Sequence, residues 1–390
     1  MAALLLTSMV WSGHAQEKNE MDLSGEWAFQ TDVMDFRRGS LDVRYCHRLQ
    51  ESIVLPGITD DYKIGYKSPY RHLDRLTRVY EYMGPAWYQR EIEIPAAWKG
   101  KRIFLYFERT HWLSSVYVGK EEVSKIDYIS IPHNHELTQW LHPGKKELIT
   151  FCIDNRYQYD THKWDHAHSE FTQINWNGVL GEIKLVAVDP PVYVDDMQVY
   201  PDIKNKSIKV KMTVRNCTEH TASGKISFHV TGKDYRLQKE VPVTVTDSIT
   251  YIEEEMFLGK DIHLWNEFHP NLYTLDCKLT SSVEGQSYAH EKSTTFGMRE
   301  VEAGEDRIIL NGEPIHLRGT VENAVFPKTG YAPVDDASWE RVLRILKEYG
   351  MNHMRFHSWC PPAAAFRMAD KLGVYLEVEM PMWGKDAQPV

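Results

Sequence analysis

Short runs of alternating apolar and polar residues, repeated at close intervals, constrain the fold of this chain more than any other feature. Between residues 23 and 188 they occur at Trp87–Ile94, Arg102–Phe107, Ser115–Val118 and Leu148–Ile153. Successive side chains of a strand point to opposite faces, so this period of two indicates strands with one buried face. Many such strands at short intervals predict a β-sandwich or jelly roll.

A second region of strand patterns follows Asp189-Pro190-Pro191. Consecutive prolines cannot continue a central strand, so we interpret these residues as a linker. The strand patterns of the second region lie at Val192–Val199, Ser207–Val214, Gly224–Val230, Val241–Val245 and Leu272–Leu279. About a hundred residues with this rhythm favour an immunoglobulin-like β-sandwich.

The pattern changes after Gly297, where helices appear between the strands. Strands are predicted at Arg307–Leu310, Ile315–Arg318, His353–His357 and Val374–Val378, with a turn at Asn311-Gly312. The two predicted helices are Ser338–Tyr349, with Ser338 as N-cap, and Pro361–Leu372. Strands separated by helices and short connections pair in parallel, as in a (β/α) barrel or a doubly wound sheet.

The last predicted strand lies close to the end of the sequence. A complete eight-stranded barrel needs roughly 250 residues, whereas only three strands and two helices fit after Ile315. A parallel sheet with an open edge is not a stable end point. We therefore expect the chain to be a fragment, or to need a partner that supplies the missing strands.

Charge and the first residues narrow the class of protein. The net charge is −10, which argues against nucleic-acid binding because that needs a basic face. Ala2–Val10 is apolar, and Gly13-His14-Ala15 resembles a cleavage site before Gln16, so residues 1–15 predict a secretory signal. This stretch is too short to span a membrane. We expect an exported protein, periplasmic or extracellular.

The cysteines and histidines do not predict a cofactor. Five scattered cysteines show no C-x-x-C spacing, so a zinc or dithiol redox site is not expected. Cys217 and Cys277 form either a disulfide or two free thiols. The loop that contains Asp160, His162, Asp165, His166 and His168 is a polar surface loop, a source of ligand contacts or, least favoured, a metal site.

Several motifs, in order along nearly the whole chain after residue 20, resemble glycoside hydrolase family 2, which contains β-galactosidases, β-glucuronidases and β-mannosidases. They are Leu23–Trp27, Ala86–Arg90, Trp98–Glu108, Val116–Lys120, Trp176–Leu185, Leu264–Tyr273, Phe296–Glu300, Leu310–Ile315 and Leu317–Gly319. The resemblance implies a sugar-binding jelly roll (16–189), an immunoglobulin-like sandwich (190–297) and an incomplete TIM barrel (298–390). It also implies retaining hydrolysis of O-glycosidic bonds at the non-reducing end of a glycan, without a cofactor.

The candidate substrate-binding residues lie where the barrel strands end, since βα loops form the site of such a barrel. Asn352–Trp359 is similar to the family's second barrel strand, in which Arg355 and His357 lie two residues apart and share a side. Arg318–Asn323 replaces the family's usual Asn-Arg-His, which implies hydroxyl ligands at Glu322 and Asn323. This difference from the family's usual sequence implies an unusual substrate.

Each candidate has an alternative role. Arg355 is a sugar ligand or part of a buried ion pair, and His357 a ligand or a core histidine. Trp359 and Trp383 either stack on sugar or fill the core; the 12 Trp and 21 Tyr suit both uses. Glu379 lines the pocket or supports it.

Retaining hydrolysis requires two carboxyl groups about 5–5.5 Å apart. Glu377 and Glu379 share a face of their strand, but the family places its acid on the fourth strand and its nucleophile on the seventh, both beyond Val390. We therefore predict no catalytic residue in this chain and no glycosidase activity from it alone. The rival interpretations are a non-catalytic carbohydrate-binding protein and a structural β-sandwich protein; the oligomeric state stays open.

Overall fold

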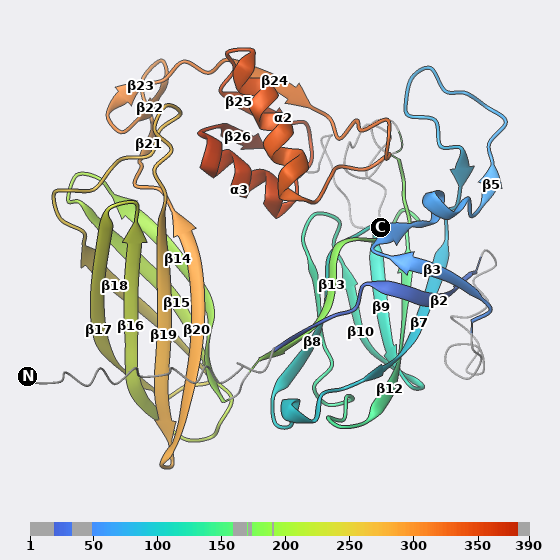
Figure 1. The fold of residues 1–390 in the computed structure, drawn as a ribbon, viewed down its shortest axis with the longest axis horizontal. Helices are drawn as coiled ribbons and strands as arrows, with labels where there is room; N and C mark the ends of the chain where they lie inside the picture. The colour runs from blue at the N-terminus through green and yellow to red at the C-terminus, as the bar shows by residue number, and fades with distance from the viewer. Residues whose placement is uncertain (1–18, 33–48, 159–169, 171–173, 189–190, 381–390) are drawn as a thin grey trace, which may run out of the picture.

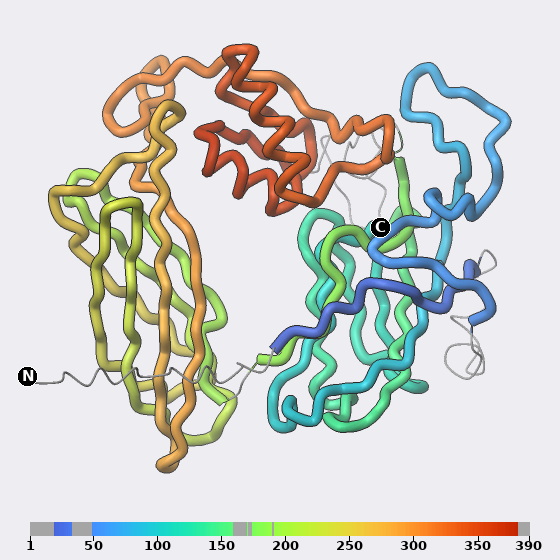
Figure 2. The backbone as a smooth tube through the Cα atoms, viewed as in Figure 1, coloured from blue at the N-terminus to red at the C-terminus, as the bar shows by residue number. Residues whose placement is uncertain are grey.

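The computed structural model describes residues 19–32, 49–158, 170, 174–188 and 191–380. The predicted signal at residues 1–15, the loop from Asp160 to His168, Cys46, Trp383 and the first two linker residues lie outside this range. Three bodies follow one another along the chain, and Figures 1 and 2 show the last of them above the two β-sandwiches. The molecule is mainly β, which confirms the coarse prediction of the fold class.

The first sandwich contains two antiparallel sheets. One has the order β1-β13-β8-β11, with β4 also paired to β13. Its strands are β1 (Glu20–Asp22), β4 (Gly57–Ile58), β8 (Arg102–Thr110), β11 (His133–Glu136) and β13 (Gly178–Val188). The other has the order β10-β9-β12-β7-β2-β3. Its strands are β2 (Gly25–Thr31), β3 (Glu51–Leu55), β7 (Pro85–Glu93), β9 (Leu113–Val118), β10 (Glu121–Asp127) and β12 (Lys146–Asp154).

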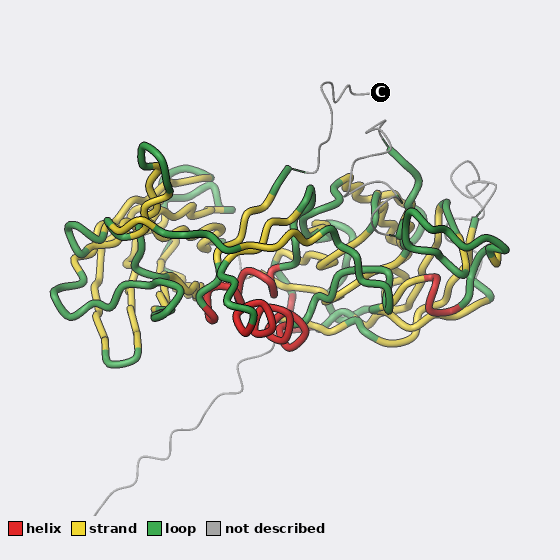
Figure 3. The backbone as a smooth tube through the Cα atoms, turned by 90° about the horizontal axis from the view of Figure 1, so that it is seen from above, coloured by secondary structure: helices red, strands yellow, loops and turns green. Residues whose placement is uncertain are grey.

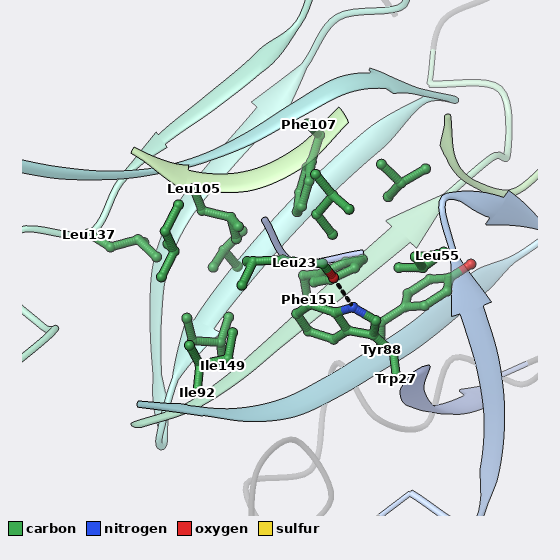
Figure 4. Close-up of a cluster of buried hydrophobic side chains, with 14 of the residues drawn as sticks. Leu23, Trp27, Leu55, Tyr88, Ile92, Leu105, Phe107, Leu137, Ile149 and Phe151 are labelled. Atoms are coloured by element: carbon green, nitrogen blue, oxygen red, sulfur yellow. Dashed lines mark hydrogen bonds between the residues drawn. The ribbon is translucent and has the colours of Figure 1, made fainter. Parts of the chain in front are cut away.

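Aromatic rings fill the space between these two sheets (Figure 4). Phe151 packs against Trp27, Tyr88 and Phe107, with ring centroids 5.0, 4.8 and 4.8 Å away. The indole N–H of Trp27 donates to the Leu23 carbonyl at 3.0 Å, so the polar edge of this buried ring is satisfied. The inward residues of the alternating runs therefore make one core.

Two short elements and a hairpin complete the first sandwich. The 3₁₀ turns are η1 (Thr59–Tyr62) and η2 (Ala96–Trp98). The hairpin pairs β5 (Tyr66–Lys67) with β6 (Tyr80–Glu81) and projects from the sandwich at the right of Figure 1.

The second sandwich packs a three-stranded sheet, β14-β15-β18, on a four-stranded sheet, β17-β16-β19-β20. Its strands are β14 (Val192–Asp202), β15 (Ser207–Asn216), β16 (Ala222–Gly232), β17 (Tyr235–Val245), β18 (Ile249–Phe257), β19 (Tyr273–Val283) and β20 (Gln286–Phe296). All neighbours within its sheets are antiparallel. Cys277 is a free thiol buried in this core and Cys217 is a free exposed thiol, so the two do not form a disulfide.

A small sheet leads into the third body. It consists of β21 (Val301–Ala303), β22 (Ile308–Leu310) and β23 (Glu313–Pro314). Asn311 and Gly312 join β22 to β23 with positive φ values of 55° and 83°, as the predicted Asn-Gly turn requires.

The third body, which we call the parallel unit, has strands β24 (Gly319–Glu322), β25 (His353–Phe356) and β26 (Tyr375–Val378) and helices α2 (Asp336–Glu348) and α3 (Ala363–Leu372). Both strand pairs are parallel, as predicted. Trp339, Leu343 and Leu346 recur at helical spacing in α2 and are buried against the sheet. Seen from above, both helices lie on one side of the strands (Figure 3).

Two local predictions for this unit are wrong. Ile315–Arg318 is not a strand, because the first parallel strand begins only at Gly319. Asp335, rather than Ser338, is the N-cap of α2; its carboxylate accepts from the backbone N–H of Ser338 at 2.8 Å. A carboxylate three residues earlier reaches the free N–H groups of the first turn and also suits their positive potential.

The helices of the described residues are all too short or too polar to cross a membrane. The second sandwich and the parallel unit are joined by a hydrogen bond, since the Trp265 indole N–H donates to the Asp370 carbonyl at 2.7 Å. This hydrogen bond holds the parallel unit, and with it the open face of its sheet, against the second sandwich. Contacts with the first sandwich are described below.

Candidate functional site

The candidate site lies on the face of the parallel sheet that the helices leave open. Partners in register across parallel strands share a side, and the register joins Val321 to Arg355 and Arg355 to Glu377. Met354 and Phe356, the neighbours of Arg355 along β25, point to the opposite side and are buried with the helices. Arg355 therefore lies on the accessible face.

Arg355 lies between two carboxylates of the neighbouring strand segment. Its Nε donates to Glu379 Oε1 at 2.5 Å, and the same atom lies 3.7 Å from Glu377 Oε1. On the far side of Glu377, His353 Nε2 is 3.3 Å from Oε2. The side chains of Arg355 and Glu379 are 38% and 23% exposed, so this ion pair is half-buried. Of the two roles proposed for Arg355, the ion pair is present, while the guanidinium keeps access to solvent.

Ser358 fixes the second oxygen of Glu379. Its hydroxyl donates to Oε2 at 2.8 Å. Burial acts to raise the pKa of Glu379, but the bonds from Ser358 and Arg355 outweigh it, so this pKa lies below its usual range. A general acid needs a raised pKa. Glu379 is therefore suited to holding Arg355 or accepting from a hydroxyl, and not to donating a proton.

Glu322 lies on the other side of the sheet. The register pairs it with Phe356, so its side chain starts on the helix-covered face and not beside Arg355. Its carboxylate accepts from the backbone N–H of Ala324 at 3.0 Å. Burial raises the pKa of Glu322 to about 7, against the opposing effect of backbone N–H groups of residues 323–325. The structure thus separates the Glu322 carboxylate from Arg355 and Glu379 and gives it a local role in the turn after β24.

Asn323 keeps an acceptor available. Its Oδ1 is buried and makes no hydrogen bond with any described residue. Buried amide oxygens are nearly always satisfied. This oxygen lacks a donor among the described residues but is closed to solvent, and the ligand role predicted for Asn323 stays a prediction.

His357 and Trp359 follow β25 in an irregular segment. The backbone N–H of His357 donates to the Glu322 carbonyl at 3.0 Å, and its ring influences the titration of Glu379. Trp359 is only 5% exposed; its indole N–H donates to the same carbonyl at 3.1 Å, and its ring lies 5.2 Å from that of Phe356. This position matches the core-filling alternative for Trp359 more closely than the stacking one.

Ser358 was not predicted from the sequence. Its role depends on Glu379, which follows 21 residues later on another strand. No sequence pattern predicts a hydrogen bond from a serine in an irregular segment. The contact with Glu379 becomes visible only when the register of β25 and β26 is known. Among the described residues, no group of three or more histidine, cysteine or acidic side chains is placed to hold a metal.

The profile of Glycosyl hydrolases family 2 matches residues 192–299, which contain the second sandwich. The beta-galactosidase of Thermoanaerobacter pseudethanolicus is 23% identical over 305 residues, 78% of this chain and 40% of that protein. The beta-glucuronidase of Sus scrofa is 22% identical over 415 residues, 97% of this chain and 59% of that protein.

Solved structures share the fold. The structure of Bacteroides uniformis beta-glucuronidase 2, covalently bound to cyclophellitol-6-carboxylate aziridine, has a TM-score of 0.73 at 19% identity. It is matched over 93% of this chain and 42% of its own. A beta-glucuronidase from Ruminococcus gnavus in complex with D-glucuronic acid has a TM-score of 0.70 over 93% of this chain. The chain spans 40 to 59% of the length of the two curated relatives above.

Proposed function

We propose, from the premise that this chain belongs to glycosyl hydrolases family 2, that the protein hydrolyses O-glycosidic bonds of a glycan. In finer terms it acts as a β-galactosidase-like or β-glucuronidase-like exo-glycosidase with retention of configuration. The observation that carries this proposal is the polar cluster of Arg355, Glu377, Glu379 and Ser358 on the open face of the parallel sheet. Strand ends of such sheets are where α/β enzymes bind their substrates.

The domain composition is part of the same proposal. We assign residues 16–189 to a sugar-binding jelly roll, 190–297 to an immunoglobulin-like sandwich, and 298–390 to part of a TIM barrel. Two packed antiparallel sheets in each of the first two bodies support the sandwich assignments. The parallel strands with helices on one side support the third.

Within the cluster, Arg355 is the main candidate for holding sugar hydroxyls. Glu379 and Ser358 fix its position, because Glu379 binds both groups. Asn323 and His357 remain candidate hydroxyl ligands. A retaining hydrolase needs one protonated and one ionised carboxyl group about 5–5.5 Å apart. The bonds from Ser358 and Arg355 favour the ionised form of Glu379, so we do not assign it as the general acid; Glu377 lies 3.7 Å from Arg355 and is assigned to holding that side chain.

The same observation favours a second candidate function, a non-catalytic carbohydrate-binding protein. Its support is that the cluster offers carboxylate acceptors for hydroxyl groups, while the lowered pKa of Glu379 does not suit proton donation. Binding without cleavage is therefore the alternative for the chain of 390 residues.

One experiment separates these functions. Purified protein is incubated with 4-nitrophenyl β-galactoside, β-glucuronide and β-mannoside, and binding of the corresponding non-hydrolysable sugars is measured by calorimetry. Turnover with retained configuration, followed by NMR of the product, supports the hydrolase; binding without turnover supports the alternative.

Arg355→Ala should weaken sugar binding about tenfold or more, since it removes a charged donor. The control Arg367→Ala removes an exposed arginine paired with Asp336. If the protein neither binds nor hydrolyses any of these sugars, both proposed functions are contradicted.

We also propose that the protein is exported to the periplasm or beyond. The support is the apolar stretch Ala2–Val10 followed by Gly13-His14-Ala15. N-terminal sequencing of protein recovered outside the cytoplasm should begin at Gln16; a start at Met1 would contradict cleavage.

A further inference from the structure

A small cavity lies between the first sandwich and the parallel unit. Its volume is about 50 Å³, and its lining includes Arg109, His111, Ser130, Trp176, Tyr331 and Cys360. The first four come from β8 and the segments around β9 to β13, and the last two from the parallel unit. Only Trp359 belongs both to this lining and to the predicted site residues.

Arg109 is the charged group of the cavity. Its Nη2 donates to the Cys360 carbonyl at 3.1 Å. A guanidinium has five N–H donors; besides Cys360, which it meets through both carbonyl and side chain, and the nearby charge of Glu108, Arg109 has no hydrogen-bond acceptor and no close ion pair among the described residues. Burial lowers the pKa of Arg109, although arginine stays protonated. The carboxylate of the adjacent Glu108 turns elsewhere and accepts from the backbone N–H of Glu182 at 2.9 Å.

The buried Arg78 of the first sandwich shows what the partly buried Arg109 lacks. The side chain of Arg78 is 4% exposed and binds Asp60 at 2.7 Å, with Glu170 at 3.7 Å. A partly buried guanidinium without a carboxylate in hydrogen-bond contact is desolvated with little opposite charge to offset the cost. Arg109 therefore has the free donors and the electrostatic demand of an anion site.

The walls and the size of the cavity limit the ligand. The Trp176 ring contacts that of His111 at 5.4 Å and faces Tyr331 at 6.5 Å between centroids. Apolar rings exclude water and strengthen a charge pair beside them. A volume of about 50 Å³ exceeds the roughly 10–15 Å³ that one water needs, so a small planar anion has room. A carboxylate fits, while the rest of its molecule would lie at the mouth.

We propose that this cavity binds a carboxylate, with the guanidinium of Arg109 as its ionic partner and the Ser130 hydroxyl as a further donor. The planar fork of arginine matches the two oxygens of a carboxylate. The ligand is either a small free acid or an acidic sugar unit of a glycan. Because Arg109 also binds the Cys360 carbonyl, the bound anion links β8 to the segment that follows β25. This inference does not depend on hydrolysis.

The test is calorimetry and thermal unfolding with sodium acetate, sodium glucuronate and glucose at constant ionic strength. Acetate and glucuronate should bind and raise the unfolding temperature, whereas glucose should do neither. Arg109→Gln should weaken carboxylate binding about tenfold or more, since it removes the charged fork. The matched control, Arg367→Gln, changes an exposed arginine that is already paired with Asp336 and should bind like the unchanged protein.

The comparison of ligands identifies the source of the carboxylate. Equal affinity for acetate and glucuronate indicates a small free acid, and tighter binding of glucuronate indicates an acidic sugar. Equal binding of glucose and glucuronate, or equal carboxylate binding by Arg109→Gln and unchanged protein, overturns the proposal. If Arg109→Gln does not fold, Arg109→Lys carries the test: it keeps the charge but not the fork, and unchanged affinity again overturns the proposal.

Discussion

The interiors of the two sandwiches differ in the side chains that fill them. In the first sandwich, rings such as those of Trp27, Phe107 and Phe151 pack on one another between the sheets. In the second, valine, isoleucine, leucine and methionine make up most of the core around Phe228, and ring contacts join Tyr235, Tyr273 and Phe296. The two bodies share an architecture, but rings dominate one core and aliphatic side chains the other.

Buried polar groups show the same contrast. The second sandwich buries Ser207, Asn216 and Ser281. The first sandwich buries many more: Asp32, Thr59, Arg78, Gln89, Thr110, His111, Ser114, Ser115, His133, His135, Thr150, Asp154, Asn155, Asn175 and Asn177. Buried polar networks fix unique positions when every group is bonded.

The position of these groups explains the difference. His133 holds the carbonyl of Tyr128 at 2.8 Å, and the next residue, Ile129, packs against the core of the parallel unit. The first sandwich therefore uses its polar interior to hold segments that border the parallel unit and the Arg109 cavity. The second sandwich buries few polar groups and carries exposed charge pairs across its strands.

Truncation of a central ring tests the aromatic core. Phe151→Ala should destabilise the first sandwich by about 4–5 kcal/mol, because it leaves a cavity and removes three ring contacts. Phe228→Ala should destabilise the second by about 3 kcal/mol, the lower part of the range for such changes. Denaturant unfolding gives the free energies, and hydrogen exchange of peptides from each body assigns them. Equal losses for the two variants would contradict the contrast between the cores.

Acid should affect the first sandwich more than the second. His133 Nε2–H donates to Tyr128 O, and Ser114 Oγ lies 2.6 Å from His133 Nδ1 and 2.8 Å from His135 Nε2. Ser124 Oγ lies 2.8 Å from His135 Nδ1. Every ring nitrogen is thus bonded while both rings are neutral. Burial lowers the pKa of His133 to about 4 and that of His135 to about 3, although Asp127 opposes the shift at His133.

The direction of the pH effect follows from these shifts. Both pKa values lie below the ordinary 6.5, so the unfolded chain binds protons more readily than the folded one. Stability is full above about pH 6.5 and falls as the pH drops towards 4, by about 3 kcal/mol for His133 alone. Unfolding of the unchanged protein and of His133→Gln at pH 7 and pH 5 measures this. The variant should lose less stability on acidification; identical losses would show that other groups control it.

A smaller loss is expected from one buried amide. Asn177 Nδ2 donates to the carbonyls of Gly84 and Ile153, each at 3.0 Å, and its Oδ1 accepts from the Tyr88 hydroxyl at 3.0 Å. Asn177→Ala leaves these three buried groups unpaired and should cost about 2–3 kcal/mol. The control in the second sandwich is Asn205→Ala, whose exposed side chain bonds only Asp202, with an expected change within about 0.5 kcal/mol. Denaturant unfolding compares them, and a similar small effect in both would argue against a structural role for the polar interior.

The sequence predicted strands well where one face is apolar. Arg102–Phe107 falls within β8, and Ser207–Val214 within β15. Strands β18 and β20 were not predicted, because polar residues occupy both of their faces and each buries a single residue near its end, Met256 in β18 and Phe296 in β20. Their place depends on partner strands that local alternation does not reveal.

The site was predictable in composition but not in pairing. Arg355 and Glu379 were named, and the structure brings them together. The side taken by Glu322 was not predictable, because a one-residue shift of a strand moves a side chain to the other face, and the strand begins at Gly319 rather than Ile315. The Arg109 cavity joins residues 251 positions apart, so no local pattern marks it.

The smallest effect should come from the charged surface of the second sandwich. Lys278 and Glu291 are direct cross-strand neighbours, 2.7 Å apart and more than half exposed. Exposed pairs of this kind contribute about 0.2–1 kcal/mol and are screened by salt. A double-mutant cycle of Lys278→Ala and Glu291→Ala should give a coupling in that range that disappears at about 1 M salt, where the Debye length is only about 3 Å. A larger, salt-resistant coupling would mean that surface charge holds this body together. The aliphatic core would then no longer account for its stability, and the two sandwiches would differ in the source of their stability as well as in the side chains of their interiors.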